Sequence, residues 1–189
     1  NNDNYTYDYF RESQTWGNQH NIGLTYSINK EKNYDFQIKI FTNTSNGKLD
    51  ANKTIEFTQN KFQEERIGKL NDHTKSIVPT LDIYYSKTLP KNNSIAFNVV
   101  GSYFDNEQNT HSAESGSTGF DDMMYINNQK KTLIGEAIYN HKFNKSNLSF
   151  GYRTHLNYLT NKVTNSLSEK LQKENINTQK HYIYGEVSG

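Results

Sequence analysis

The sequence predicts an all-β fold, built as an antiparallel up-and-down meander of strands. Apolar residues recur at every second position in several segments, which is the period of a strand with one apolar face. Short polar turns join these segments in pairs. Long polar stretches separate the pairs, so a unit of strand, turn, strand and loop recurs about every 55 to 60 residues.

The composition fits a sheet with little interior. Of the 189 residues 32% are hydrophobic and the mean hydropathy is −0.98, yet 13% are aromatic, a residue class that disordered chains lack. The net charge of +1 comes from interspersed acids and bases, so no basic stripe indicates a nucleic-acid partner. The absence of cysteine excludes disulfides, thiolate metal ligands and a cysteine nucleophile.

The clearest hairpin lies in residues 80–104, with a turn at residues 90–93. Its apolar residues alternate with polar ones and would share one face of a sheet: Leu81, Ile83, Tyr85, Ile95, Phe97, Val99 and Tyr103. β-Branched and aromatic residues dominate both segments, which favours strands over a helix.

A similar hairpin precedes it, with strands at residues 20–28 and 34–42 and a turn at residues 29–33. The alternating apolar residues of these strands are Ile22, Leu24, Tyr26, Ile28, Phe36, Ile38 and Ile40. Residues 4–15 also alternate but lack an aliphatic face, so we expect a strand tip or a loop edge there.

A third hairpin covers residues 131–143 and 148–158, and a last strand is expected around residues 181–187. The shared face of the third hairpin would carry Leu133, Gly135, Ala137, Tyr139, Leu148, Phe150, Tyr152, Leu156 and Tyr158. Ile134 and Ile138 break the alternation of its first strand.

Three long polar connections are expected, at residues 43–75, 105–130 and 161–178. Within them, only residues 54–57 hint at a strand, and a short helical turn is expected near residues 167–171. Structureless connections of this length argue against a compact domain unless they are exposed or functional. All short turns would then lie at one end of the sheet and all long loops at the other.

These features favour a segment of a large transmembrane β-barrel, with short periplasmic turns and long extracellular loops. A strand of about ten residues rises about 33 Å, and at a tilt near 45° it spans the hydrocarbon core. Alternation alone does not separate a barrel from a soluble sandwich, whereas the asymmetry of loop lengths favours the barrel. Aromatic residues near strand ends agree with interfacial girdles: Tyr26, Phe41, Tyr103, Phe143 and Tyr158.

The segments LDIYYSKTLPKNNSIAFNVVGSY and LIGEAIYNHKFNKSNLSFGYRTHLNY, followed by YIYGEVSG, resemble the C-terminal barrel of the outer-membrane β-barrel family related to TonB-dependent receptors. The resemblance covers residues 17–189 and rests on strand rhythm and on Gly-Glu-apolar phrases at residues 135–137 and 185–187. It implies a location in the outer membrane of a Gram-negative bacterium. In that family a carboxypeptidase-regulatory-like domain and a plug precede a barrel of about 22 strands.

The resemblance also implies how the chain is organised and what it contacts. Residues 1–189, which begin without a methionine, are expected to form a partial barrel domain of about seven or eight strands. The plug and the remaining strands would lie elsewhere in a longer parent chain. The implied partners are outer-membrane lipid, that plug and, through the N-terminal part of the parent, the TonB energy-coupling system.

Two groups of residues are candidates for function. The polar residues opposite the apolar face are candidates for the lumen wall: Asp82, Tyr84, Asn98, Glu136, Arg153, His155 and Glu186. Candidates for ligand contact from the loops are Trp16, Phe120, Asp121, Asp122 and Tyr125. No catalytic residue, metal site or cofactor is predicted, because the histidines are scattered and no nucleophile or phosphate-binding motif occurs.

The expected function is that of an outer-membrane receptor or transporter, which binds a solute through its extracellular loops and lumen and passes it to the periplasm. The alternative is a soluble all-β module, a sandwich or propeller fragment that recognises glycans through exposed tyrosines and Trp16. A propeller would show four strands in each repeat of about 40 to 50 residues. This sequence shows two strands in a longer repeat.

Overall fold

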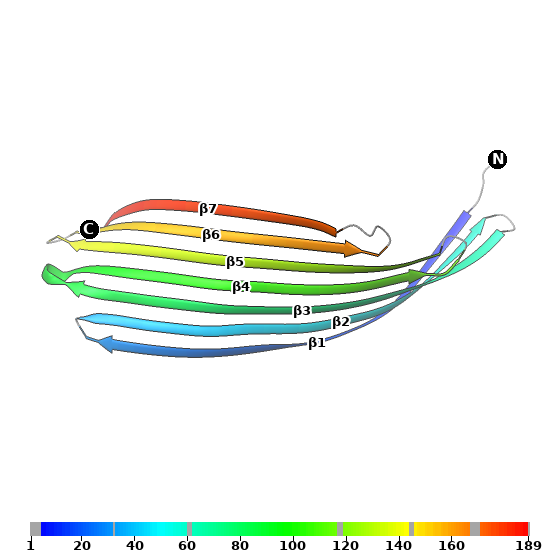
Figure 1. Ribbon diagram of the computed structural model, residues 1–189, viewed down its shortest axis with the longest axis horizontal. Helices are drawn as coiled ribbons and strands as arrows, with labels where there is room; N and C mark the ends of the chain where they lie inside the picture. Colours follow the sequence, from blue (N-terminus) through cyan, green and yellow to red (C-terminus); the bar gives the residue numbers. More distant parts are fainter. Residues whose placement is uncertain are drawn as a thin grey trace.

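The computed structural model describes residues 5–31, 33–59, 62–116, 119–143, 146–166 and 171–188. They form one sheet of seven antiparallel strands in sequence order, which confirms the all-β meander (Figure 1). The strands are β1 (Tyr5–Lys30), β2 (Tyr34–Gln59), β3 (Phe62–Leu89), β4 (Asn93–Glu114), β5 (Phe120–Lys142), β6 (Asn147–Asn165) and β7 (Leu171–Ser188). The sheet is open, and β1 and β7 are its edges.

The stretches predicted as long loops are strands, and this part of the prediction is wrong. β2 and β3 run through residues 43–75 except at the tip between Gln59 and Phe62, and the polar stretches that follow extend β4 to β7 in the same way. Residues 5–15 likewise belong to β1. The connections at this end, such as that from Glu114 to Phe120, are short. Of the helical turn expected near residues 167–171, only Leu171 is described, and it begins β7.

Polar side chains paired across the strands explain how these stretches stay extended. The Ser45 and Ser76 hydroxyls lie 2.7 Å apart between β2 and β3. Asp72 of β3 accepts hydrogen bonds from Gln108 Nε2 (3.0 Å) and Thr110 Oγ1 (3.1 Å) of β4. Such cross-strand pairs stabilise a sheet without an apolar face.

Each strand pair keeps a single register along its length. In β4–β5, for example, the pairing runs without an inserted residue from Ser94–Asn140 to Glu114–Phe120. Because side chains alternate with a period of two, this register carries each face of the sheet unchanged across all seven strands. We call the face that carries Val99 the apolar face and the face that carries Asn98 the polar face.

The apolar face carries a continuous band in the half of the sheet near the short turns. We call it the apolar band: Ile22, Leu24, Tyr26, Ile28, Phe36, Ile38, Ile40, Leu81, Ile83, Tyr85, Ile95, Phe97, Val99, Leu133, Ala137, Tyr139, Leu148, Phe150, Tyr152, Leu156, Ile183 and Val187. Leu24 is 70% exposed and Ile183 73%. Among the described residues, the only buried apolar side chains are Ala51 and Ile55, which lie on the polar face in the other half.

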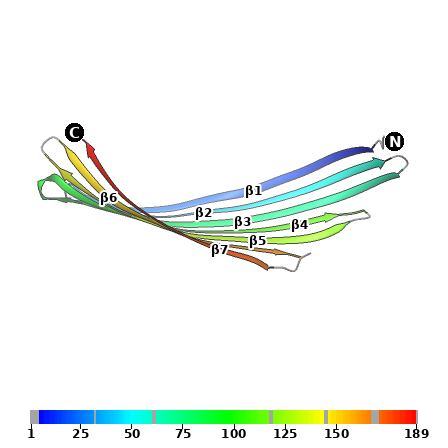
Figure 2. The ribbon, with the colours of Figure 1, turned by 90° about the horizontal axis from the view of Figure 1, so that it is seen from above.

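The strands are long, twisted and bent (Figure 2), as the right-handed twist of β-strands requires. The short turns and the C-terminal end of β7 lie at one end of the sheet, and the beginning of β1 lies at the other (Figure 1). The described part of the chain contains no helix that is long and apolar enough to cross a membrane.

The turn between β3 and β4 is a short 3₁₀ helix, η1 (Pro90–Asn92). Pro90 begins it, where the fixed φ of proline suits a turn. Lys91 and Asn92 have φ values of 61° and 58°, in the left-handed region. Asparagine tolerates this conformation better than lysine, whose Cβ crowds the backbone.

We expect Lys91→Gly to raise the free energy of unfolding by about 0.5 to 1 kcal/mol, because glycine adopts a left-handed conformation without a Cβ clash. Lys91→Ile should lower it by about 1 kcal/mol, because a β-branched side chain adopts this conformation least readily. Urea unfolding of the full-length protein in detergent micelles measures both changes. Equal stability of the two variants would contradict the left-handed turn.

Candidate functional site

The register places all seven predicted lumen-wall residues on the polar face. Tyr84, Asn98, Glu136 and Arg153 are successive partners across β3, β4, β5 and β6. The other three, Asp82, His155 and Glu186, occupy neighbouring positions of the same face. Their alternation in the sequence thus predicted a shared surface correctly, while their role as a lumen wall stays a prediction.

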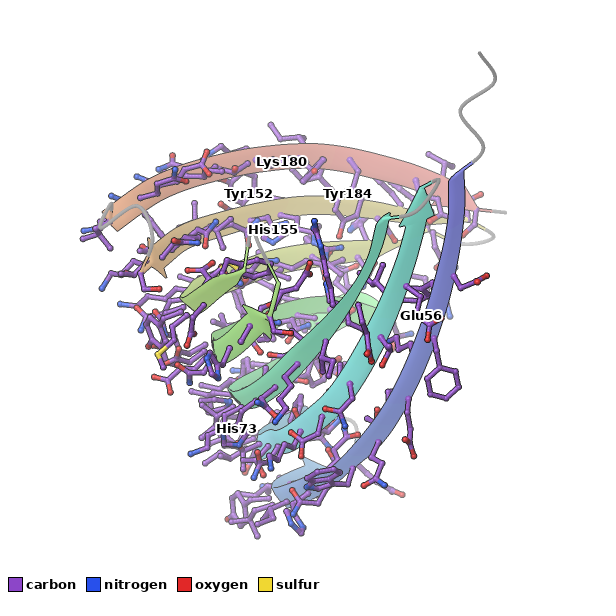
Figure 3. The ribbon with its side chains drawn as sticks, turned by 90° about the vertical axis from the view of Figure 1, so that its right-hand side faces the viewer. Glu56, His73, Tyr152, His155, Lys180 and Tyr184 are labelled. Atoms are coloured by element: carbon purple, nitrogen blue, oxygen red, sulfur yellow. The ribbon has the colours of Figure 1, made fainter. Side chains whose placement is uncertain are left out.

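A hollow of about 570 Å³ on this face is lined by Glu136, Arg153, His155, Tyr182 and Tyr184. Tyr184 and Lys180 extend from β7 and His155 from β6 (Figure 3). The Tyr184 hydroxyl donates a hydrogen bond to Glu136 Oε1 at 2.9 Å. The two tyrosines were missed by the sequence analysis, although their alternation with Ile183 in the last strand indicates the same face as Glu186.

Gly151 of β6 provides the space for the Tyr184 side chain. A Cβ atom at position 151 would overlap the ring and hydroxyl of Tyr184. The aromatic ring therefore covers a glycine on the neighbouring strand, an arrangement that compensates for the missing side chain. It also holds the Tyr184 hydroxyl at the carboxylate of Glu136.

The polar face combines both signs of charge and hydrogen-bonding groups. Glu136 and Arg153 are direct cross-strand partners, and Lys39 and Asp82 are another such pair. Asn98 Oδ1 is buried and has no hydrogen-bond partner among the described residues. Such a surface can bind a polar solute or a polar protein segment through several hydrogen bonds. The unpaired acceptor Asn98 Oδ1 favours a partner that brings a hydrogen-bond donor.

The residues predicted to contact a ligand from loops lie in strands instead. Trp16 is in β1, and Phe120, Asp121, Asp122 and Tyr125 are in β5. They also divide between the faces: the register puts Trp16, Asp121 and Tyr125 on the apolar face, beyond the apolar band, and the other two on the polar face. The structure therefore does not bring all five together.

The apolar face is hollowed beyond the band. The hollow has a volume of about 420 Å³, and its lining includes Lys48, His73, His111, Met123 and Tyr125. Trp16 lies beside it, with Lys48 Nζ 4.8 Å from the centre of a Trp16 ring. Two histidines and a lysine make this hollow more polar than the band itself, and its lining also includes Asp72.

Partners within the sheet already engage the polar groups near this hollow. His111 Nε2 lies 2.7 Å from Asp121 Oδ1, and Asp122 accepts from Ser166 Oγ at 2.9 Å. The Tyr125 hydroxyl donates to Glu107 Oε1 at 3.3 Å. Burial, and then the Glu107 carboxylate, raise the pKa of Tyr125 above its ordinary value. No group of three or more acidic or histidine side chains among the described residues could hold a metal ion.

Comparisons with known proteins agree with the fold. No protein-family model matches the sequence, and no curated protein matches it significantly. The chain is similar to the ferric citrate transporter FecA in its unliganded form, with a TM-score of 0.54 and 11% sequence identity over 92% of this chain and 25% of that chain. It is also similar to the ferric yersiniabactin uptake receptor FyuA from Yersinia pestis, with a TM-score of 0.47 and 8% identity over 92% of this chain and 34% of that chain.

The similarity to FecA shows the fold alone at this level of identity. The seven-stranded antiparallel meander is therefore an arrangement also found in part of the FecA structure. The chain spans about a quarter of FecA and about a third of FyuA.

We expect Gly151→Ala to lower the free energy of unfolding by about 1 kcal/mol, because the new methyl group displaces Tyr184 and breaks its hydrogen bond to Glu136. Urea unfolding of the full-length protein in micelles measures the loss. Gly185→Ala is the matched control, since its Cβ would meet only the Ser149 carbonyl oxygen at 3.6 Å. If the two variants lost the same stability, Gly151 would have no special role.

Proposed function

We propose that the chain is part of an outer-membrane β-barrel of a Gram-negative bacterium, which binds a solute through its lumen and its extracellular half and passes it to the periplasm. The apolar band is the observation that supports this proposal most. It crosses all seven strands on one face, in the half near the short turns, and no other described part of the chain packs on it. Water-soluble monomers rarely expose an apolar patch of more than a few hundred Å².

The height of the band fits a membrane. In β6 the band together with Tyr158, which borders it, runs from Leu148 to Tyr158, ten residues apart. At about 3.3 Å per residue and a tilt of about 40°, this distance gives a height of about 25 Å, the height of the apolar band in outer-membrane barrels. A lipid bilayer would cover the band completely.

The apolar face becomes polar directly beyond the band. Asp105 of β4 accepts hydrogen bonds from the Tyr103 hydroxyl (3.1 Å), Asn127 Nδ2 (3.1 Å) and Gln129 Nε2 (3.4 Å). A carboxylate bound in this way belongs at or above the headgroups, while Tyr103 and Tyr158 lie where an aromatic girdle is expected. The strands therefore extend well beyond the membrane on the side away from the short turns.

The open edges of the sheet require further strands. In lipid each unpaired backbone N–H or C=O group costs several kcal/mol, so spanning sheets close into barrels. In our proposal the remaining strands of a longer parent chain pair with β1 and β7, and a plug of that parent contacts the polar face. Coupling to the TonB system would run through the N-terminal part of the parent.

The polar face would contribute to the solute path. Its hollow offers a carboxylate, a guanidinium, an imidazole and phenol hydroxyls, from Glu136, Arg153, His155, Tyr182 and Tyr184. These groups suit reversible binding of a polar solute, and the proposal includes no catalytic step. A soluble glycan-binding module is disfavoured, because it would need a second layer to cover the apolar band.

A charge placed in the middle of the band tests the proposal. Val99→Arg should destabilise the folded, membrane-inserted protein by about 2 to 4 kcal/mol, because it puts a guanidinium into hydrocarbon. Val100→Arg is the matched control, since the neighbouring residue lies on the polar face. Heat-modifiable migration of the full-length protein from outer-membrane fractions measures folding. Equal effects of the two variants, or recovery of the protein as a soluble monomer, would refute the proposal.

The orientation can be tested with single cysteines, because the chain has none of its own. Asp121→Cys replaces a side chain that is 71% exposed, at the end of the sheet away from the short turns. Lys91→Cys places the second cysteine in a short turn. A membrane-impermeant maleimide should label position 121 on intact cells, and position 91 only after the outer membrane is permeabilised. The reverse pattern would show that the short turns face outward.

A further inference from the structure

Three lysines lie on the apolar face immediately beyond the apolar band. Lys131 of β5 pairs with Tyr158 at the edge of the band. Lys162 of β6 and Lys173 of β7 pair directly with each other, four residues further along the strands. We call Lys131, Lys162 and Lys173 the lysine patch.

Within β5 to β7, no acidic residue on the same face balances the lysine patch. The nearest acids of that face are Asp105 and Glu107 of β4, and Asp105 accepts hydrogen bonds from Tyr103, Asn127 and Gln129. The apolar face of β5 from Met123 to His141, and of β6 and β7 over their described lengths, carries no aspartate or glutamate. Glu136, Glu174 and Glu186, the acidic residues of these segments, all lie on the polar face. Ion pairs found in the described part of the chain involve other residues.

The pairing of Lys162 with Lys173 is unfavourable in the isolated sheet. Like charges directly opposite each other on one face repel. The adjacent cross-strand pair on this face, Thr160 and Asn175, does not relieve the repulsion between the lysines. The Thr160 hydroxyl donates to Asn175 Oδ1 at 3.0 Å, and both side chains are uncharged. An anion between the two ammonium groups would convert the repulsion into two attractive contacts.

The phosphate groups of lipid headgroups are anions at the required height. We propose that the lysine patch binds phosphate-bearing headgroups of lipids in the outer leaflet. The inference rests on the proposed function, because only an apolar band in lipid puts these lysines at headgroup level. By contrast, the lysine at the same height in β3, Lys75, pairs directly with Glu107 of β4. Lipid phosphate should therefore gather along β5 to β7.

The experiment uses the full-length protein, purified in neutral detergent. The protein is titrated separately with phosphatidic acid, phosphatidylcholine and inorganic phosphate, and native mass spectrometry measures the bound fraction. Phosphatidic acid should bind more tightly than phosphatidylcholine. Lys131→Gln should weaken that binding about fivefold, and the triple variant with Lys162→Gln and Lys173→Gln more than twentyfold. Lys130→Gln is the matched control, because the adjacent lysine lies on the polar face.

The outcomes separate this inference from the proposed function. Unchanged binding of phosphatidic acid by the triple variant, or equal losses in Lys130→Gln and Lys131→Gln, would overturn the inference alone. Displacement of phosphatidic acid by equimolar inorganic phosphate would also overturn it, because the site would then recognise a free ion. Heat-modifiable migration shows whether each variant folds. A parent protein absent from the outer membrane would instead refute the proposed function.

Discussion

The constant register of the seven strands is the constraint on which the other features depend. Every cross-strand neighbour follows from it, and a shift of one residue in a single pair would reverse the faces of all strands beyond that pair. The short turns fix this register. The turn between Lys30 and Tyr34, and the 3₁₀ turn Pro90–Asn92, each hold one hairpin in the pairing that aligns its apolar residues.

The same register gives the two halves of the sheet different surroundings. Near the short turns most exposed apolar side chains lie on the apolar face, Phe41 on the polar face being an exception, and the polar face is better shielded beside them: Thr80 is 9% exposed, whereas Leu81 is 40% exposed. In the other half Ala51 and Ile55 are likewise buried on the polar face, but the apolar face there also buries a polar residue, Asn127, whose side chain donates a hydrogen bond to Asp105. In the proposed orientation, a change of solvent along the strands, from lipid to water, accounts for the polar residues on the apolar face of that half.

The sequence predicts the hairpins and their faces because a period of two is visible wherever one face is apolar. The prediction fails in residues 43–75, 105–130 and 161–178, because asparagine, threonine, lysine and glutamine occupy both faces there, which removes the period. The bonds that keep those segments extended, such as Ser45–Ser76, join residues of different strands and have no local signal. The Gly151–Tyr184 contact was likewise hidden, because it needs the register of β6 against β7.

The distribution of charge adds an argument that hydrophobicity alone does not provide. In a sheet between two aqueous phases, acids and bases would be mixed on both faces to limit repulsion. In β5 to β7 the acids after Asp122 lie on the polar face, where Glu136 meets Arg153, whereas Lys162 meets Lys173 on the other face. Repulsion between those lysines is tolerable when an anion lies outside the sheet beside the row of Lys162 and Lys173. The charge pattern and the apolar band therefore indicate the same boundary, at the row of Lys131 and Tyr158.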